Sequence, residues 1–120
     1  METKETPTIV MQEKAKADFE VYLKKHLLLI NLKNMLALEF EDYPFEMQSG
    51  VYTAYLRDKG IEIVVFPQTK GYTPEIKTLN PLCTIWVGTK FYTYNTALIS
   101  AINEGLRIVE EQLKDKENDS

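Results

Sequence analysis

The sequence contains a single cysteine, a single histidine and only five glycines in 120 residues. One cysteine, Cys83, excludes an internal disulfide and is typical of a reducing compartment. The absence of HExxH, CxxC and histidine-pair motifs argues against a zinc or di-metal site. The sequence also lacks a glycine-rich phosphate loop and a GxSxG nucleophile elbow. We therefore expect no cofactor, no metal and no enzymatic activity.

Segments that direct a chain into a membrane are missing as well. The start, METKETPTIV, has neither the basic segment nor the apolar core of a secretion signal. The most apolar window, residues 26–40, is interrupted by Asn31, Lys33 and Asn34 and is too short to span a bilayer. These absences predict a cytoplasmic protein with no membrane partner.

The sequence has fewer basic than acidic residues, with 14 Lys and Arg against 18 Asp and Glu, which gives a net charge of −4. Phosphate binding needs a basic face, so nucleic acid is not expected as the main partner. A hydrophobic content of 44% is ordinary for one globular domain with its own core. We predict a single domain over residues 9–113, between a flexible tail at 1–8 and a polar tail at 114–120.

Residues 9–30 have the periodicity of an amphipathic helix. Phe19, Tyr22 and Leu23 fall on one side of it, and lysines and carboxylates occupy the rest. The pattern beyond residue 30 fits two structures. It favours a bent or two-part helix that continues to about residue 38, and the alternative is a first strand at 35–41.

A second amphipathic helix is predicted from about residue 97 to 113, where apolar residues recur at steps of three and four. Thr93 or Asn95 can cap its start, since either side-chain oxygen can accept from a free backbone N–H. Gly105 lies in the apolar stripe and favours a close approach of another element. The helix is expected to fray after Leu113.

The middle of the chain alternates β-branched or aromatic residues with turn formers, a pattern typical of strands. In chain order we predict a connector at 41–50, a strand at 51–57, a hairpin turn at 58–60, a strand at 61–66, a long irregular loop at 68–81 and a strand at 82–87. The resulting fold class is α+β. A small antiparallel sheet of three to four strands packs against a long N-terminal helix and a C-terminal helix, in α-β-β-β-α order.

This order of elements resembles, in outline, the double-stranded-RNA-binding domains. Those domains grip phosphates with a lysine-rich first turn of the last helix. The corresponding stretch here, residues 94–98, contains no basic residue, and Lys90 alone lies nearby. The resemblance therefore implies an arrangement of helices and strands, and nucleic-acid binding is only the alternative function.

A second resemblance covers residues 91–106, FYTYNTALISAINEGL. This segment is similar to the ending of short phage and prophage-type proteins of gut bacteria, in which a "Tyr-x-Thr-Tyr-x-x-Ala-Leu" segment turns from a strand into a helix. The resemblance implies a phage or mobile-element origin and a local fold.

Several residues with reactive or ligating side chains have simpler interpretations. We interpret His26 as a structural histidine on the first helix, and Cys83 as a small buried hydrophobic residue of a strand. The carboxylates of Glu39, Glu41, Asp42 and Glu46 match no calcium loop, so an acidic loop or a face for a basic partner is favoured.

Aromatic residues are the strongest sign of a binding surface. A sheet with helices on one side leaves some rings on the other face or at an edge, where they can contact a partner. The candidate binding residues are Tyr43, Phe45, Tyr52, Tyr72, Trp86, Tyr92 and Lys90.

The sequence thus predicts a small non-enzymatic module for protein interaction or regulation, with a protein as its partner. A homodimer through the apolar run at 27–30 is a further expectation. The alternative is a nucleic-acid-binding domain that uses Trp86, Tyr92 and Lys90 together with Lys70 and Lys77.

Overall fold

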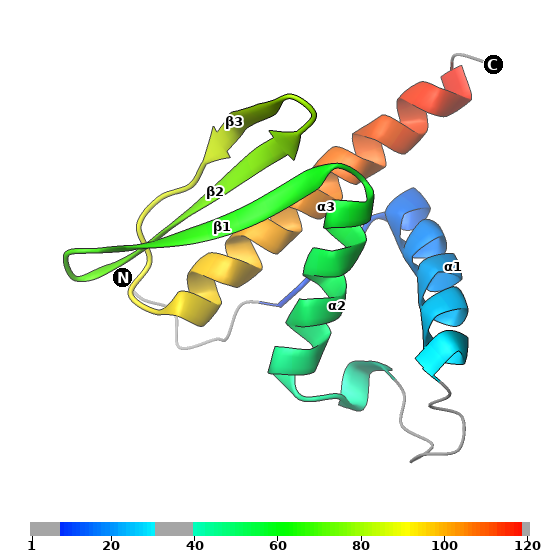
Figure 1. The fold of residues 1–120 in the computed structure, drawn as a ribbon, viewed down its shortest axis with the longest axis horizontal. Coiled ribbons are helices and arrows are strands. Elements are labelled where there is room, and N and C mark those ends of the chain that lie inside the picture. Colours follow the sequence, from blue (N-terminus) through cyan, green and yellow to red (C-terminus); the bar gives the residue numbers. More distant parts are fainter. Residues whose placement is uncertain (1–7, 31–39, 119–120) are drawn as a thin grey trace.

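The computed structural model describes residues 8–30 and 40–118. The α+β class and the antiparallel sheet are confirmed, but the order of the elements is α-α-β-β-β-α (Figure 1). The elements are α1 (Glu13–Ile30), a 3-10 turn η2 (Phe40–Asp42), α2 (Phe45–Asp58), β1 (Ile61–Gln68), β2 (Gly71–Leu79), β3 (Leu82–Val87) and α3 (Tyr94–Asn118). In this part of the chain no helix has the length and apolar character needed to cross a bilayer. The prediction for residues 31–38 lies outside the described residues.

The sheet has the order β1-β2-β3, with both pairs antiparallel. Ile63 of β1 lies opposite Ile76 of β2, which in turn lies opposite Trp86 of β3. All three belong to or pack on the core, so they define an inner face that α2 and α3 cover. A β-bulge follows in β3, since Lys77 pairs with Thr84 and Ile85 is the extra residue.

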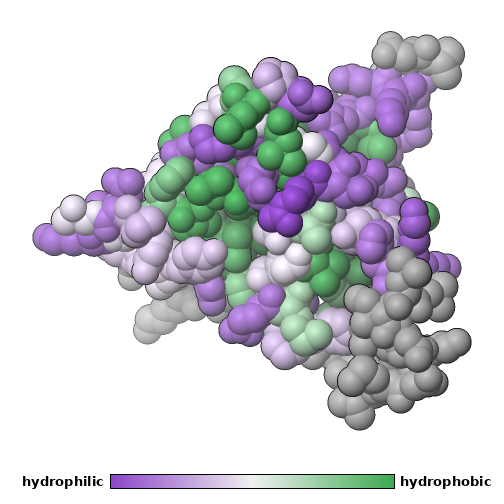
Figure 2. All heavy atoms as spheres, in the orientation of Figure 1, coloured by the Kyte–Doolittle hydropathy of each residue, from purple (hydrophilic) through white to green (hydrophobic). Residues whose placement is uncertain are grey.

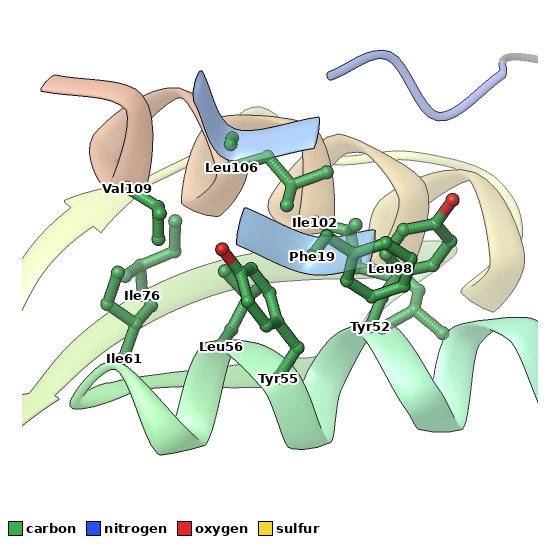
Figure 3. Close-up of a cluster of buried hydrophobic side chains, with 11 residues drawn as sticks. Phe19, Tyr52, Tyr55, Leu56, Ile61, Ile76, Leu98, Ile102, Leu106 and Val109 are labelled. Atoms are coloured by element: carbon green, nitrogen blue, oxygen red, sulfur yellow. The ribbon is translucent and has the colours of Figure 1, made fainter. Parts of the chain in front are cut away.

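Helix α3 is the element on which the others pack, and it contacts α1, α2, β1 and β2. Its buried residues, among them Ile102, Leu106 and Val109, recur at steps of three and four and form one apolar stripe. Figure 3 shows this stripe meeting Phe19 of α1 and side chains of α2 and the sheet. Helix α1 packs on α3 rather than on the sheet, which corrects the predicted position of the N-terminal helix.

The predicted strand at 51–57 is wrong, because these residues belong to α2. Pro44 precedes the helix, and Glu46 in its first turn and Arg57 in its last turn have the charges that suit the helix dipole. Its buried residues Ser49, Tyr52, Tyr55 and Leu56 lie at helical spacing. The predicted connector at 41–50 is wrong for the same reason, because α2 begins at Phe45. The turn at 58–60 is confirmed, with Gly60 at φ 83°, but it joins a helix to a strand.

The predicted loop at 68–81 is wrong as well, because it contains the central strand β2. Pro74 favoured the prediction of a loop, because proline has no N–H to donate to a neighbouring strand and is rare in central strands. Its carbonyl accepts from Gly88 N–H at 2.9 Å, beyond the last residue pair of β2 and β3, Glu75 with Val87. The missing N–H of Pro74 therefore falls where β3 has ended.

Two predictions about α3 are confirmed and one is corrected. Thr93 caps the helix, because its Oγ1 accepts from Thr96 N–H at 3.1 Å. Gly105 lies where a Cβ would come within 2.8 Å of Leu56 Cδ1, so α2 does approach closely there. The expected fraying after residue 113 is wrong, since α3 continues to Asn118.

Polar side chains of α3 fix the N-terminal segment. Asn103 accepts from Val10 N–H at 2.8 Å and donates to the Thr8 carbonyl at 2.9 Å. Glu110 is buried and accepts from Ala15 N–H at 2.8 Å, in the first turn of α1. A carboxylate suits the positive end of the α1 dipole, so Glu110 both satisfies a free N–H and orients the helix.

Candidate functional site

A cleft of about 350 Å³ lies between α2, β1 and the first turn of α3. This volume is at the lower end of the range of about 300–1,000 Å³ typical of ligand sites. The described residues that line it come from these three elements: Phe45, Glu46, Ser49, Gly50, Thr53 and Arg57 from α2, Glu62, Ile63 and Val65 from β1, and Tyr94, Asn95 and Leu98 from α3.

Small residues on α2 create the hollow. Ser49, Gly50 and Thr53 lie in the middle of the wall that α2 contributes, between Phe45 and Arg57. A Cβ added at Gly50 would meet no atom within 4 Å, so the space beside the helix is open. The cleft is therefore a consequence of residue size along one helix face.

The other walls are partly apolar. Ile63 and Val65 project from β1 on the inner face, and Leu98 rises from α3. Together with Phe45 they offer an apolar surface that an aliphatic side chain can cover. Tyr94 and Asn95 add polar groups at the α3 end.

The cleft contains one ion pair and one carboxylate, Glu46, that no described cation contacts. Arg57 donates to both oxygens of Glu62, from Nε at 3.0 Å and from Nη2 at 3.1 Å. These hydrogen bonds and the charge of Glu62 raise the pKa of Arg57. Glu46, in contrast, is exposed, and its carboxylate contacts no cation among the described residues. The cleft therefore has a negative rim that can attract a cationic group.

Strand β1 presents an unpaired backbone edge beside the cleft. Among the described residues the sheet order leaves β1 bonded only to β2, and α2 contacts β1 and runs away from its start at a steep angle (Figure 1). An edge strand has free N–H and C=O groups on its unpaired side. An extended chain placed between β1 and α2 could bond to this edge while its side chains enter the cleft.

A second surface consists of the outer face of the sheet, which lies opposite α2 and α3. Its large apolar residues are exposed: Phe66, Leu79, Leu82, Ile85 and Val87. Figure 2 shows hydrophobic surface gathered over this sheet region, with hydrophilic residues around it. We call these five residues the outer apolar patch.

A polar cluster elsewhere joins α1 to α2. The Tyr55 hydroxyl donates to Asp18 at 2.6 Å, and Lys59 Nζ lies 2.8 Å from the same carboxylate. Burial and the Asp18 carboxylate raise the pKa of Tyr55, which stays a neutral donor. Partial burial alone would raise the pKa of Asp18, but the bonds from Lys59 and Tyr55 outweigh it and lower this pKa. The cluster fastens two helices, and it does not line the cleft.

The structure separates the predicted binding residues. Phe45 lines the cleft and is half-buried. Tyr52 lies on α2 rather than on a strand, and its buried ring stacks on Phe19 with centroids 4.8 Å apart. Trp86 is half-buried on the inner face of the sheet. Tyr52 is therefore a core residue, and Trp86 is turned toward the core.

The remaining candidates lie around the ends of the sheet and of α2. Tyr92 is the most exposed, and Tyr72 makes an edge-to-face contact with Tyr94 at 5.8 Å. Lys90 donates to the Thr69 carbonyl at 2.9 Å, and Tyr43 is half-buried near the start of α2. Of all the predicted residues, Phe45 alone lines the cleft.

The residues considered for chemistry have structural surroundings. The rings of His26 and Tyr22 stack with their centroids 4.0 Å apart, and His26 Nδ1 lies 2.9 Å from the Tyr22 carbonyl oxygen. Cys83 is exposed, so the expectation of a buried cysteine is wrong. No group of three or more His, Cys, Asp or Glu side chains arranged to hold a metal occurs within residues 8–30 and 40–118. The Glu39 part of the acidic cluster lies outside the described residues.

The cleft could not be recognised from the sequence while residues 51–57 were assigned to a strand, because they belong to α2. A signal was present in Ser49, Gly50 and Thr53, whose small side chains lie within four residues of one another. On a helix these positions fall near one face, so they leave a hollow where a neighbour packs beside them. This inference requires α2 to be recognised first.

Comparisons with protein-family models, with curated proteins and with solved structures found no match to this chain. The resemblances to phage-type proteins and to double-stranded-RNA-binding domains therefore stay predictions.

Proposed function

We propose that the chain is a non-enzymatic protein-interaction module that binds an extended segment of a partner protein in the cleft between α2 and β1. The observation that carries this proposal is the combination of a concave, partly apolar cleft with an unpaired strand edge along it. Strand addition supplies affinity through backbone hydrogen bonds, and alternate side chains that enter a pocket supply specificity.

The charges of the cleft favour a basic segment. Glu46 pairs with no cation within residues 8–30 and 40–118, whereas Arg57 and Glu62 neutralise each other. The whole chain has a net charge of −4, so a basic partner is also attracted over a longer range. The expected ligand is an extended peptide with an aliphatic side chain for Ile63, Val65 and Leu98, and a Lys or Arg for Glu46.

The nucleic-acid alternative gains no specific support. Of its candidate residues, Trp86 faces the core, and Lys77 already lies 3.6 Å from Glu75 and donates to Thr84 at 2.7 Å. A role in regulation and a phage or mobile-element origin are compatible with a peptide-binding module.

The test is selection from a random peptide library displayed on phage, with the wild-type chain as bait. The Gly50→Leu variant is the bait for the counter-selection, because the leucine side chain would fill open space in the cleft. A Cβ at this position meets no atom within 4 Å. Peptides enriched on the wild type should combine aliphatic and basic residues. Gly50→Leu should weaken their binding at least tenfold, which corresponds to about 1.4 kcal/mol.

The charge contribution has its own control. Glu46→Gln should weaken binding of the selected peptides, and the difference from the wild type should shrink as salt is added. Glu20→Gln, an exposed carboxylate on α1 away from the cleft, should leave binding unchanged. Peptides that bind the wild type and Gly50→Leu equally well, or a selection that enriches none, would contradict the proposal.

A further inference from the structure

Strand β3 forms the second edge of the sheet, on the side away from the cleft (Figure 1). It pairs only with β2, and its six residues, LCTIWV, include no charged residue and no proline. Edge strands of monomeric sheets are commonly protected by charges or proline. Strand β3 therefore has neither of these protections along its length.

The two ends of β3 expose apolar side chains on the same face of the sheet. Leu82 is 70% exposed and pairs with Leu79, and Val87 is 58% exposed and pairs with Glu75. Five residues apart, they would point to opposite faces of a regular strand. The bulge at Ile85 changes this alternation, so both belong to the outer apolar patch.

The charges next to the patch are compensated. Lys77 lies on the outer face, 3.6 Å from Glu75, and donates to Thr84 at 2.7 Å. A neutral surface does not attract a charged partner over a long range. On a chain with a net charge of −4, it is also a surface where two copies can approach with little repulsion.

We propose that the chain forms a homodimer by antiparallel pairing of β3 with β3 of a second copy, joining two sheets into one of six strands. A two-fold axis pairs the same strand in both copies, so one edge satisfies the other. Placing Leu82 opposite Val87 brings together apolar residues of the same face, and Cys83 then lies opposite Trp86 on the inner face. The outer apolar patches of the two copies become continuous. The dimer uses the edge opposite the cleft and is independent of the proposed function.

The test begins with the molar mass from sedimentation equilibrium over a range of protein concentrations. The wild type should show a reversible monomer–dimer equilibrium. Leu82→Lys should be monomeric over the same range, because a charge at the strand edge blocks pairing. Leu82 is 70% exposed, so this change should leave the circular dichroism spectrum unaltered. Tyr92→Lys is the matched control, since Tyr92 is 74% exposed but lies outside β3, and it should dimerise like the wild type.

A second readout locates the interface. Cys83 is the only cysteine and is exposed, so a nitroxide label can be attached to it in the native sequence. In the proposed register the two Cys83 positions are separated by three residues along the strand, roughly 10 Å, and by one strand spacing, roughly 5 Å. The labels should broaden each other's spectra, and an excess of unlabelled protein should remove the broadening.

The outcomes distinguish the proposal from its rivals. A wild type that stays monomeric at all concentrations would overturn it and leave the β3 edge for a strand of another protein. The proposal would also be overturned if Leu82→Lys still dimerised and the labels at Cys83 showed no spin broadening. The interface would then lie elsewhere, for example at the predicted segment 27–30. Gly50→Leu should still dimerise, so loss of peptide binding and loss of the dimer are separate results.

Discussion

Asp18 shows how a single residue can fasten two helices. It is a partly buried carboxylate of α1 that accepts from Tyr55 and pairs with Lys59, which both lie at the C-terminal end of α2. The ammonium of Lys59 also lies 5.5 Å from the centre of the Tyr55 ring. The three groups contact one another, so removing one of them alters the surroundings of the other two.

The lowered pKa of Asp18 predicts a dependence of stability on pH. Because the folded pKa lies below the unfolded one, ionised Asp18 stabilises the fold above the unfolded pKa of about 4. This contribution is lost as the pH falls through the folded pKa. Urea unfolding at pH 7 should therefore give a lower free energy for Asp18→Asn than for the wild type, and the difference should shrink toward pH 3.

An exposed carboxylate of α3 provides the control for this measurement. Asp115→Asn should leave the free energy of unfolding close to that of the wild type at each pH. A difference between wild type and Asp18→Asn that stays constant from pH 7 to pH 3 would show that the Asp18 charge contributes nothing.

At the scale of elements, the sequence predicts a helix correctly where one strong periodicity is present. The prediction is wrong where a helical and a strand pattern occur in the same residues. The stripe of α3 and its Thr93 cap are local signals, and both are found. Residues 51–57 include β-branched and aromatic side chains that favour a strand, yet Tyr52, Tyr55 and Leu56 are buried at helical spacing. Packing against α1 and α3 overrides the weaker local preference.

The cleft could not be predicted for a related reason. Phe45 was named for its aromatic ring, and the ring does line the cleft. Its neighbours there come from β1 and α3, and only the packing of α2 against these elements brings them together. Because residues 68–81 were predicted to be a loop, the central strand β2 was not recognised. Without β2, the sequence could not indicate that β1 and β3 are the two edge strands.

Two glycines of the helices give opposite predictions. Gly50 of α2 faces open space, so Gly50→Ala should raise the free energy of unfolding by about 0.5–1 kcal/mol through helix propensity. Gly105 of α3 packs on Leu56, whose Cδ1 would be 2.8 Å from a new Cβ. Overpacking costs about 1–3 kcal/mol, so Gly105→Ala should be destabilising despite the same gain in propensity. Urea denaturation of both variants measures the contrast, and equal stabilisation would refute the close packing of α2 on α3.

At the scale of the whole molecule, α3 packs against both other helices and against two strands of the sheet. Helix α1 packs on one part of its surface, α2 on another, and β1 and β2 on a third. Leu106 lies in the shared core and is fully buried. The helical region and the sheet should therefore lose their structure together when α3 is detached.

This coupling predicts that two probes report the same unfolding transition. Trp86, the only tryptophan, reports on the sheet by its fluorescence, and far-ultraviolet circular dichroism reports mainly on the helices. In the Leu82→Lys background, where association should not contribute, both urea curves should coincide. Leu106→Ala should lower both midpoints equally, at a cost of about 2–5 kcal/mol. If that variant does not fold, Ile102→Val, which costs about 0.5–1.5 kcal/mol, allows the same comparison. An earlier fluorescence transition would mean that the sheet unfolds on its own, and α3 would then not be the element that holds the two parts together.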